Sequence, residues 1–468
     1  MENKGIRRTG GPHLVLVPCP LQGHMNPMLH LAKLLHSKGF TITIINTQIS
    51  SHHHHHPNDL FFYESIDGGL PDASSIDGDV VPFLLELNLK CREPFRDCLA
   101  RMMVRVDGSR DHVSCIIHDS AMYFSVSVAD ELEIPRIVLR TSSAATFYGF
   151  SLLFKRKGCL PIQEDQMEEA LEEFPTLRVK DMPIFKTSYQ EAKEEIFATT
   201  IHNSTMTASA IIWNSLTCLE QLMFKNIQEN HLVPIFPIGP LHKHSKASLT
   251  TKPILTKEDH HPCIVWLDTQ TPKSVIYVSL GSLVAISENE FIEMGWGLAN
   301  SDQPILWVVR PGLVHGSNGS NLVDLFPKEL NELMSKRACK FTDWAPQEQV
   351  LAHPSIGGFL THNGWNSTIE SICEGVPMIC WPCFGDQRVN ARFVSHFWRV
   401  GVQLEDKLER EDIESAIRRL MVDKEGKKIR GRAIQFKEKI GFSLRQGGSS
   451  CVFLDNLVDF IKTKSNPF

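Results

Sequence analysis

The first half of the chain alternates short apolar runs with amphipathic segments. Residues 13–17 form an apolar run that fits a buried strand, and a loop rich in proline and glycine follows over residues 18–27. Residues 26–38 then repeat apolar side chains at helical spacing, and the β-branched run 40–45 fits a second strand. A strand, a helix and a strand in this order predict a βαβ unit, and therefore a parallel sheet.

The same alternation continues further along the first half. Apolar runs at residues 113–117 and 134–139 flank a helical pattern that begins after Asp119. Parallel strands joined by helices are typical of a sheet with helices on both faces. We therefore predict one doubly wound α/β domain over residues 1–245.

A polar stretch at residues 246–260 has the composition of a linker between domains. Apolar and helical patterns resume after it and predict a second doubly wound domain over residues 261–448, followed by a C-terminal helix at 449–468 that packs back on the first domain. Two tandem Rossmann-like parallel-sheet domains would face each other across a ligand-binding cleft. The second domain rests on strand patterns at 274–279, 305–309, 357–361 and 377–380 and helical patterns at 288–299 and 367–374.

Composition and charge exclude several classes of partner. The chain has 468 residues, of which 42% are hydrophobic and 22% charged, as in ordinary globular proteins. Its formal net charge of -6 provides no basic field, so we expect no nucleic-acid partner. No N-terminal signal core is present, and no apolar segment reaches the roughly 20 residues that span a bilayer. We therefore expect a cytoplasmic protein without integral membrane contact. We also expect a monomer, although these observations do not bear on oligomeric state.

The most specific pattern is the 44-residue segment 344–387, WAPQEQVLAHPSIGGFLTHNGWNSTIESICEGVPMICWPCFGDQ. Its strand 357–361 runs through His362 and a glycine turn into a helix that begins near Asn366. The N-terminus of a helix presents N–H groups and a partial positive charge, which suit a pyrophosphate. Side chains of His362, Asn366 and Ser367 could add hydrogen bonds to the same oxygens.

This segment matches the C-terminal signature box of plant family 1 UDP-glycosyltransferases in length, in both end residues and in nearly every fixed position, so the chain resembles that family. The resemblance implies a glycosyltransferase B-type fold whose first domain binds the acceptor and whose second binds the UDP-sugar. Asn363 departs from the pattern, because family members usually carry Cys or Ser there. The tight turn 279–282, which ends in Ser282, offers a second phosphate cradle. For any single residue of the box, an ordinary strand, turn and capped helix remains the alternative.

The resemblance also implies roles for individual residues. Trp344 would stack on uracil, and Glu370 would accept hydrogen bonds from the ribose hydroxyls, since a carboxylate suits paired donors. Asp386 and Gln387 would contact the hexose, and Gln at the last position favours glucose whereas His favours galactose. The expected UDP-sugar-binding residues are Ser282, Trp344, Ala345, Gln347, His362, Gly364, Trp365, Asn366, Ser367, Glu370, Asp386, Gln387 and Thr141.

Glycosyl transfer to an alcohol needs a base that takes the acceptor proton. His24 lies after the first strand, in the loop that carries the catalytic histidine of the family. Asp119 follows strand 113–117 at the position of the family's supporting aspartate, which would fix the tautomer of His24. Thr141 lies at another strand end, in a loop that approaches the transferred sugar in relatives. From the residues alone, a histidine is more often a surface or satisfied core residue than a catalyst, and Asp119 could be a helix N-cap.

Together with these residues, the resemblance implies inverting transfer of glucose from UDP-glucose to a hydroxyl, carboxyl or amine of a small lipophilic acceptor such as a flavonoid, another phenolic, a terpenoid glycoside or a cytokinin. We expect no cofactor and no metal, and the five histidines at 52–56 have no carboxylate or cysteine nearby in sequence. Two other classes of protein fit the sequence less well. A nucleotide-sugar-binding protein without turnover would lose His24 or Asp119, and both are present. An NAD(P) oxidoreductase would need G-x-G-x-x-G, which neither βα turn contains.

Overall fold

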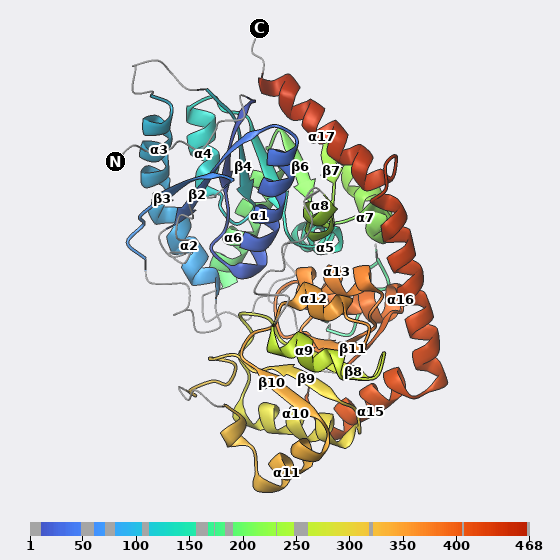
Figure 1. Cartoon of the computed structure of the whole chain (residues 1–468). Coiled ribbons are helices and arrows are strands. Elements are labelled where there is room, and N and C mark those ends of the chain that lie inside the picture. Colours follow the sequence, from blue (N-terminus) through green and yellow to red (C-terminus); the bar gives the residue numbers. More distant parts are fainter. Residues whose placement is uncertain are drawn as a thin grey trace. The chain divides into compact units, whose positions relative to one another are not determined.

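The computed structural model divides the chain into two compact α/β units (Figure 1). The first unit comprises residues 1–161, 185–250 and 443–468, and the second comprises residues 162–184 and 251–442. The residues whose structure is described are 11–47, 60–70, 80–104, 112–155, 167–172, 174–182, 191–230, 232–247, 261–317, 322–404 and 407–465.

Seven parallel strands form the sheet of the first unit, in the order β3-β2-β1-β4-β5-β6-β7. The strand order reverses between β1 and β4, which are neighbours in the sheet. β2, β4, β5 and β6 are buried along their whole length, and the apolar runs of β4, β5 and β6 fit this burial, whereas β2 alternates threonine and isoleucine. The strands are β1 (His13–Val17), β2 (Thr41–Thr47), β3 (Phe62–Ile66), β4 (Val113–Asp119), β5 (Arg136–Arg140), β6 (Ala210–Trp213) and β7 (Ile235–Pro237).

The C-terminal helix α17 (Ser449–Ser465) belongs to this first unit, where it packs against β4 and β7. Its apolar face, which includes Leu457 and Ile461, joins α1 and the central strands in one buried core. The other helices of the unit are α1 (Gln22–Ser37), α2 (Val80–Lys90), α3 (Arg92–Met102), α4 (Phe124–Glu131), α5 (Ala144–Lys155), α6 (Glu191–Met206), α7 (Thr217–Asn230) and α8 (Leu241–Ala247).

Six parallel strands form the sheet of the second unit, in the order β10-β9-β8-β11-β12-β13, and the strand order reverses between β8 and β11. Both predicted doubly wound parallel sheets are therefore present. The strands are β8 (Val275–Ser279), β9 (Ile305–Val308), β10 (Cys339–Thr342), β11 (Ile356–Thr361), β12 (Met378–Cys380) and β13 (Gly401–Gln403). The helices are α9 (Pro262–Asp268), α10 (Glu288–Asn300), α11 (Lys328–Lys336), α12 (Gln347–Ala352), α13 (Trp365–Glu374), α14 (Gln387–Arg392), α15 (Arg410–Met421) and α16 (Lys424–Ser443).

Helix α1 begins earlier than its sequence indicates. We expected a loop over residues 18–27, but the helix starts at Gln22, so His24 lies in its first turn. The first N–H groups of a helix lack carbonyl partners in a preceding turn and must be satisfied in another way, and here the Leu21 carbonyl accepts from both His24 and Met25. Pro27 removes only one hydrogen bond close to the helix start. Proline and glycine are weak helix formers, so the sequence of these residues indicates a loop where the structure has the first turns of a helix.

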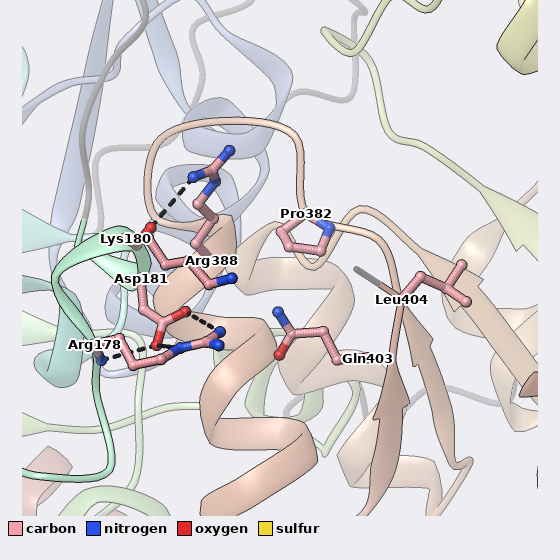
Figure 2. Close-up of a pocket in the computed structure, with 7 residues that line it drawn as sticks. All are labelled: Arg178, Lys180, Asp181, Pro382, Arg388, Gln403 and Leu404. Carbon is pink, nitrogen blue, oxygen red and sulfur yellow. Dashed lines mark hydrogen bonds and ion pairs between the residues drawn. The ribbon is translucent and has the colours of Figure 1, made fainter. Parts of the chain in front are cut away.

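Residues 162–184 group with the second unit, although they fall inside the segment 1–245 that we expected as the first domain. Figure 2 shows one reason, because Arg388 of α14 donates to the Lys180 carbonyl (3.3 Å). Arg392, one turn further along, donates to the Thr176 carbonyl (2.8 Å). These bonds fix a short segment to α14. The small pocket beside them is lined by Arg178, Lys180, Asp181, Pro382, Arg388, Gln403 and Leu404.

Two predicted features fall largely or wholly outside the described residues. Most of the expected linker 246–260 lies there, and residues 246–247 close helix α8. The histidine run 52–56 also lies outside the described residues. Among the helices that the structure describes, none combines the length and the apolar character that a membrane crossing requires.

Candidate functional site

The predicted catalytic residues of the first unit lie where its strand order reverses. His24 follows β1 in the first turn of α1, and Asp119 is the last residue of the neighbouring strand β4. Thr141 follows β5, which pairs with β4 on its other side. Because parallel strands end at the same edge of a sheet, these three side chains meet there, which is where open α/β sheets bind ligands.

His24 is held through one ring nitrogen. Its Nδ1 lies 2.8 Å from Asp119 Oδ2 and 3.0 Å from the Thr141 hydroxyl. An ionised carboxylate only accepts hydrogen bonds, so Nδ1 carries the proton and Nε2 is the basic nitrogen. The His24 side chain is 32% exposed whereas that of Asp119 is fully buried. The pair can therefore act as a base with an oriented imidazole.

Asp119 stays ionised although it is buried. Burial raises the pKa of this carboxyl group, but the His24 imidazole, the Ala121 amide and the Arg140 guanidinium together outweigh burial and hold the pKa below its ordinary value. The second carboxylate oxygen accepts from the Ala121 N–H at 2.8 Å. Asp119 is therefore available as a negative charge that stabilises a protonated His24 during reaction.

Two supporting residues of this site are absent from the sequence prediction. Arg140 is buried at the end of β5, with its guanidinium 5.0 Å from the Phe147 ring centre. Glu220 accepts from the Ala144 and Ala145 N–H groups at 3.0 and 2.8 Å, and so caps the N-terminus of α5 behind Thr141. A charged residue at the end of a buried apolar strand is a signal for Arg140. Glu220 lies about 75 residues from its partners, and nothing local marks it.

In the second unit, the predicted phosphate turns also follow the two strands at which the order reverses. The turn 279–282 follows β8, and the turn after β11 leads through Gly364 into α13. The His362 ring lies between Gly281 and Gly364, and a Cβ atom on either glycine would approach it within 2.6 Å. Only glycine fits at these two positions, which brings the two turns together around one imidazole.

The side chains of this turn suit a phosphate. Burial lowers the pKa of His362 to about 4, so its imidazole is neutral at pH 7 and can donate one hydrogen bond. Helix α13 starts at Trp365 after Gly364, which has no side chain to occupy the first N–H groups, and its first turn contains no acidic residue. Asn366 and Ser367 lie in that first turn. The arrangement presents N–H groups and a positive dipole end to an anion.

Asn363 adopts a left-handed backbone, with φ of +61°. Asparagine tolerates this conformation better than most residues that carry a side chain. The departure from Cys or Ser is therefore compatible with the geometry of the turn. Arg310 supports the neighbouring turn by donating to the Gly281 carbonyl at 2.8 Å, a role that no sequence pattern indicates.

The predicted nucleoside residues form a connected group. Gln347 donates to Glu370 Oε2 at 2.8 Å and to the Ser367 hydroxyl at 2.9 Å. Trp344 is 47% exposed, so its ring has an open surface on which a base can stack, and the His261 ring lies at its edge. Ala345 is buried in the same segment, and Ser282 is exposed.

Gln387, the last residue of the segment 344–387, is oriented by backbone N–H groups of the same segment. The Gln387 Oε1 atom accepts from the Cys383 and Phe384 N–H groups at 2.8 and 3.0 Å. The amide oxygen is thus occupied, and the NH2 group is the part of Gln387 left to meet a sugar hydroxyl. Asp386 Oδ2 accepts from Asn390 Nδ2 at 3.0 Å. All these residues lie in one loop and the first turns of α14.

Comparison with known proteins places the chain among glycosyltransferases. The family model described as UDP-glucoronosyl and UDP-glucosyl transferase matches residues 84–431. UDP-glycosyltransferase 76C4 of Arabidopsis thaliana is 42% identical over 466 residues, covering 98% of this chain and 100% of that protein. Flavonol 3-O-glucosyltransferase UGT76E12 of the same plant is 40% identical over 473 residues, covering 99% of each.

Solved structures agree in fold. The crystal structure of Os79 from O. sativa in complex with UDP superposes with a TM-score of 0.81 at 26% identity, covering 96% of this chain and 100% of that one. UDP-glucose: anthocyanidin 3-O-glucosyltransferase in complex with UDP gives a TM-score of 0.79 at 27% identity, covering 98% and 100%. The predicted fold class, with two Rossmann-like domains of the glycosyltransferase B type, is confirmed.

Proposed function

Because this chain belongs to the family of UDP-glucoronosyl and UDP-glucosyl transferases, we propose that it transfers glucose from UDP-glucose to a hydroxyl of a small lipophilic acceptor with inversion at the anomeric carbon. The observation that carries the proposal is the hydrogen-bonded pair of His24 and Asp119 at the strand-order reversal of the first unit. A protein that only bound a nucleotide sugar would have no need of an oriented base.

His24 is the proposed general base. Its Nε2 takes the proton of the acceptor hydroxyl while the oxygen attacks the anomeric carbon from the side opposite UDP, which gives a β-glucoside. Asp119 holds the proton of Nδ1 and stabilises the imidazolium that forms. The Thr141 hydroxyl, 3.0 Å from the same nitrogen, helps to keep the ring in place.

The second unit is the proposed donor site. As the bond to the sugar breaks, negative charge gathers on the departing UDP, and the N-terminus of α13 together with His362 is suited to receive it. Gln347, Ser367 and Glu370 would bind the ribose, and Trp344 would stack on uracil. These groups supply the charge stabilisation that the reaction needs, so we propose that it uses no metal and no further cofactor.

Glucose is the proposed hexose because Gln387 ends the segment 344–387, and its amide oxygen is held by backbone N–H groups, so that its NH2 group would donate to the sugar beside the acceptor Asp386. A phenolic or terpenoid hydroxyl is the proposed acceptor group. The names of related proteins support this class, since they include a flavonol 3-O-glucosyltransferase and an Os79 complex that contains a trichothecene.

Product analysis tests this proposal. The full chain is incubated with UDP-glucose or UDP-galactose and a panel of flavonols, other phenolics, terpenoids and cytokinins, and products are identified by mass and by the anomeric proton coupling. We expect β-glucosides from UDP-glucose and much less product from UDP-galactose. An α-glucoside would contradict inversion, and UDP binding without any product would favour the nucleotide-sugar-binding alternative.

A further inference from the structure

A buried thiol lies beside the proposed base and has no part in the proposed reaction. Cys19 follows β1 between two prolines, Pro18 and Pro20, which restrict its backbone. It is completely buried. Ligand atoms of Cys19, His24 and Asp119 all lie within 4.8 Å of one another, and within the described part of the chain no other three histidine, cysteine or acidic side chains come together in this way.

The three groups form a ligand set for a thiophilic divalent cation. Thiolate, imidazole and carboxylate are the protein ligands of Zn²⁺, and three of them with one open position are typical of zinc sites that exchange a ligand. Zinc distances of about 2.0 to 2.3 Å place tetrahedral ligands roughly 3.3 to 3.8 Å apart. Shifts of about 1 Å would therefore close this cluster around an ion.

Charge also favours such a cation. Burial, followed by the Asp119 carboxylate, raises the pKa of the Cys19 thiol well above its ordinary value, so without a metal the thiol keeps its proton. A divalent ion that displaced this proton would face one thiolate, one carboxylate and one neutral imidazole. The resulting site has no net charge, which suits a buried position. His24 is the partly exposed member, so an ion would enter along its ring.

We propose that Cys19, His24 and Asp119 bind Zn²⁺ or a similar thiophilic cation, and that this binding reversibly inhibits the enzyme. On binding, the Cys19 thiol releases its proton to solvent and its sulfur coordinates the ion. The Asp119 carboxylate exchanges its hydrogen bond from His24 for a bond to the ion. A water molecule completes the four ligands.

The inhibition follows from the tautomer of His24. The ion occupies Nδ1, which in the active form carries the proton shared with Asp119. That proton moves to Nε2, because a neutral imidazole carries one proton and its metal-bound nitrogen carries none. Nε2 then has no lone pair to take the proton of the acceptor. The inhibitory effect rests on the proposed function, whereas binding of the ion does not.

The first test compares inhibition in matched variants. Transfer rates of the full chain are measured over a range of Zn²⁺ concentrations for wild type, Cys19→Ala and the control Cys115→Ala, each relative to its own rate without zinc. Cys115 is also buried, in β4, and among the residues that the structure describes it belongs to no such group. We expect Cys19→Ala to need roughly tenfold or more zinc for half inhibition. Cys115→Ala should behave like wild type, EDTA should restore activity, and Mg²⁺ should not inhibit.

The second test measures metal binding directly in wild type, so it depends neither on transfer activity nor on the folding of a variant. Co²⁺ replaces Zn²⁺ in such sites, and a bound thiolate adds a charge-transfer absorption band. We expect wild type with bound Co²⁺ to show this band at the intensity of one coordinated thiolate per chain. The histidines at 52–56 bind Co²⁺ through nitrogen and add no such band. Equal zinc sensitivity of wild type and Cys19→Ala, or no thiolate band in wild type, would overturn the proposal. A chain with the band but without transfer activity would count against the proposed function alone.

Discussion

Two side chains of the candidate sites are held in one orientation, because one of the two polar atoms of each already makes hydrogen bonds within the protein. His24 Nδ1 is held by Asp119, which leaves Nε2 for the substrate. The oxygen of the Gln387 amide is held by two backbone N–H groups, which leaves its NH2 group for a sugar. Substitutions that change these held atoms should therefore affect the chemistry more than the fold.

Asp119→Asn should keep the shape of the base site but remove the charge that fixes the His24 tautomer. We expect the transfer rate to fall roughly 10²- to 10⁴-fold, the usual contribution of a working acid-base group. Affinity for UDP, which is predicted to bind in the second unit, should stay the same. Steady-state kinetics together with UDP calorimetry would check this. A variant with nearly full activity would show that His24 needs no carboxylate.

Gln387→Glu should remove the donor that the structure leaves for the sugar. We expect transfer efficiency with UDP-glucose to fall about tenfold, which corresponds to the loss of one or two hydrogen bonds. Free UDP lacks the hexose, so its affinity should be unchanged. Inhibition by UDP measured beside the kinetics with UDP-glucose separates the two effects. Equal weakening of UDP and UDP-glucose would contradict a sugar contact.

At the residue scale, the sequence predicts the role of a residue when the pattern that indicates the role lies close to it in the chain. His24, Asp119 and Gln387 stand in local patterns that indicate them. Glu220 acts through contacts with partners that are remote in sequence, and no local pattern indicates its role. Arg140 is marked locally as a charged residue that ends an apolar strand, but its effect on Asp119 arises only in the folded chain.

Secondary-structure elements carry these residues to common edges. In each unit, the site follows the two central strands at which the strand order reverses, β1 and β4 or β8 and β11. Helix α14 adds a direct link in the second unit. Asn390 on α14 donates through one Nδ2 atom to Asp386 and to the Asn363 carbonyl, each at 3.0 Å. It thereby joins the predicted hexose and phosphate turns.

Asn390→Ala should uncouple the two turns. We expect the turnover with UDP-glucose to fall by about tenfold while affinity for UDP falls less, because two acceptors lose one buried donor. Asn331→Ala is a matched control, since Asn331 also donates to a backbone carbonyl of the second unit, that of Phe326. Kinetics and UDP titrations of both variants check the prediction. It is wrong if Asn390→Ala changes only thermal stability.

Periodicity predicts the central strands β1, β4, β8 and β11 and their neighbours β2, β5, β9 and β12. It does not predict β6, β7, β10 and β13, which span only three or four residues and lie towards the edges of the sheets. Helix α1 was predicted to start late because glycine and proline occupy its first turns. Short elements and unusual helix starts depend on tertiary contacts, which a local pattern does not contain.

At the scale of the whole molecule, both units bury histidines in their cores. Burial lowers the pKa of His118 and His244 in the first unit, and of His362 in the second, to about 4 from 6.5. The unfolded chain therefore binds more protons than the folded chain between these values. Their contribution to stability is fully present above pH 6.5 and is lost as pH falls towards 4.

We expect the melting temperature to fall steeply between pH 6.5 and 4, because each buried histidine adds at most about 1.4 kcal/mol per pH unit to the loss. His244→Gln removes one such group and should flatten the profile. Calorimetric or fluorescence melting at several pH values measures both. A melting temperature that stays level over this range would mean that these histidines are protonated without cost in the folded chain.

Domain boundaries were the least predictable feature at this scale. The second unit includes residues 162–184, which the sequence places in the first half of the chain. Bonds from α14 to this segment span more than 200 residues, as for Arg388 to Lys180, and no composition change marks them. The two doubly wound sheets themselves were predicted, because their alternating pattern repeats along hundreds of residues.

The most direct test of the account is UDP release from UDP-glucose with and without acceptors, compared between wild type and His24→Ala. The account predicts acceptor-dependent release by wild type that falls roughly 10²- to 10⁴-fold in His24→Ala, with UDP binding retained. Release by His24→Ala at the wild-type rate would contradict His24 as the base. A chain that neither binds UDP nor releases it would contradict the assignment of residues 344–387 as the donor site.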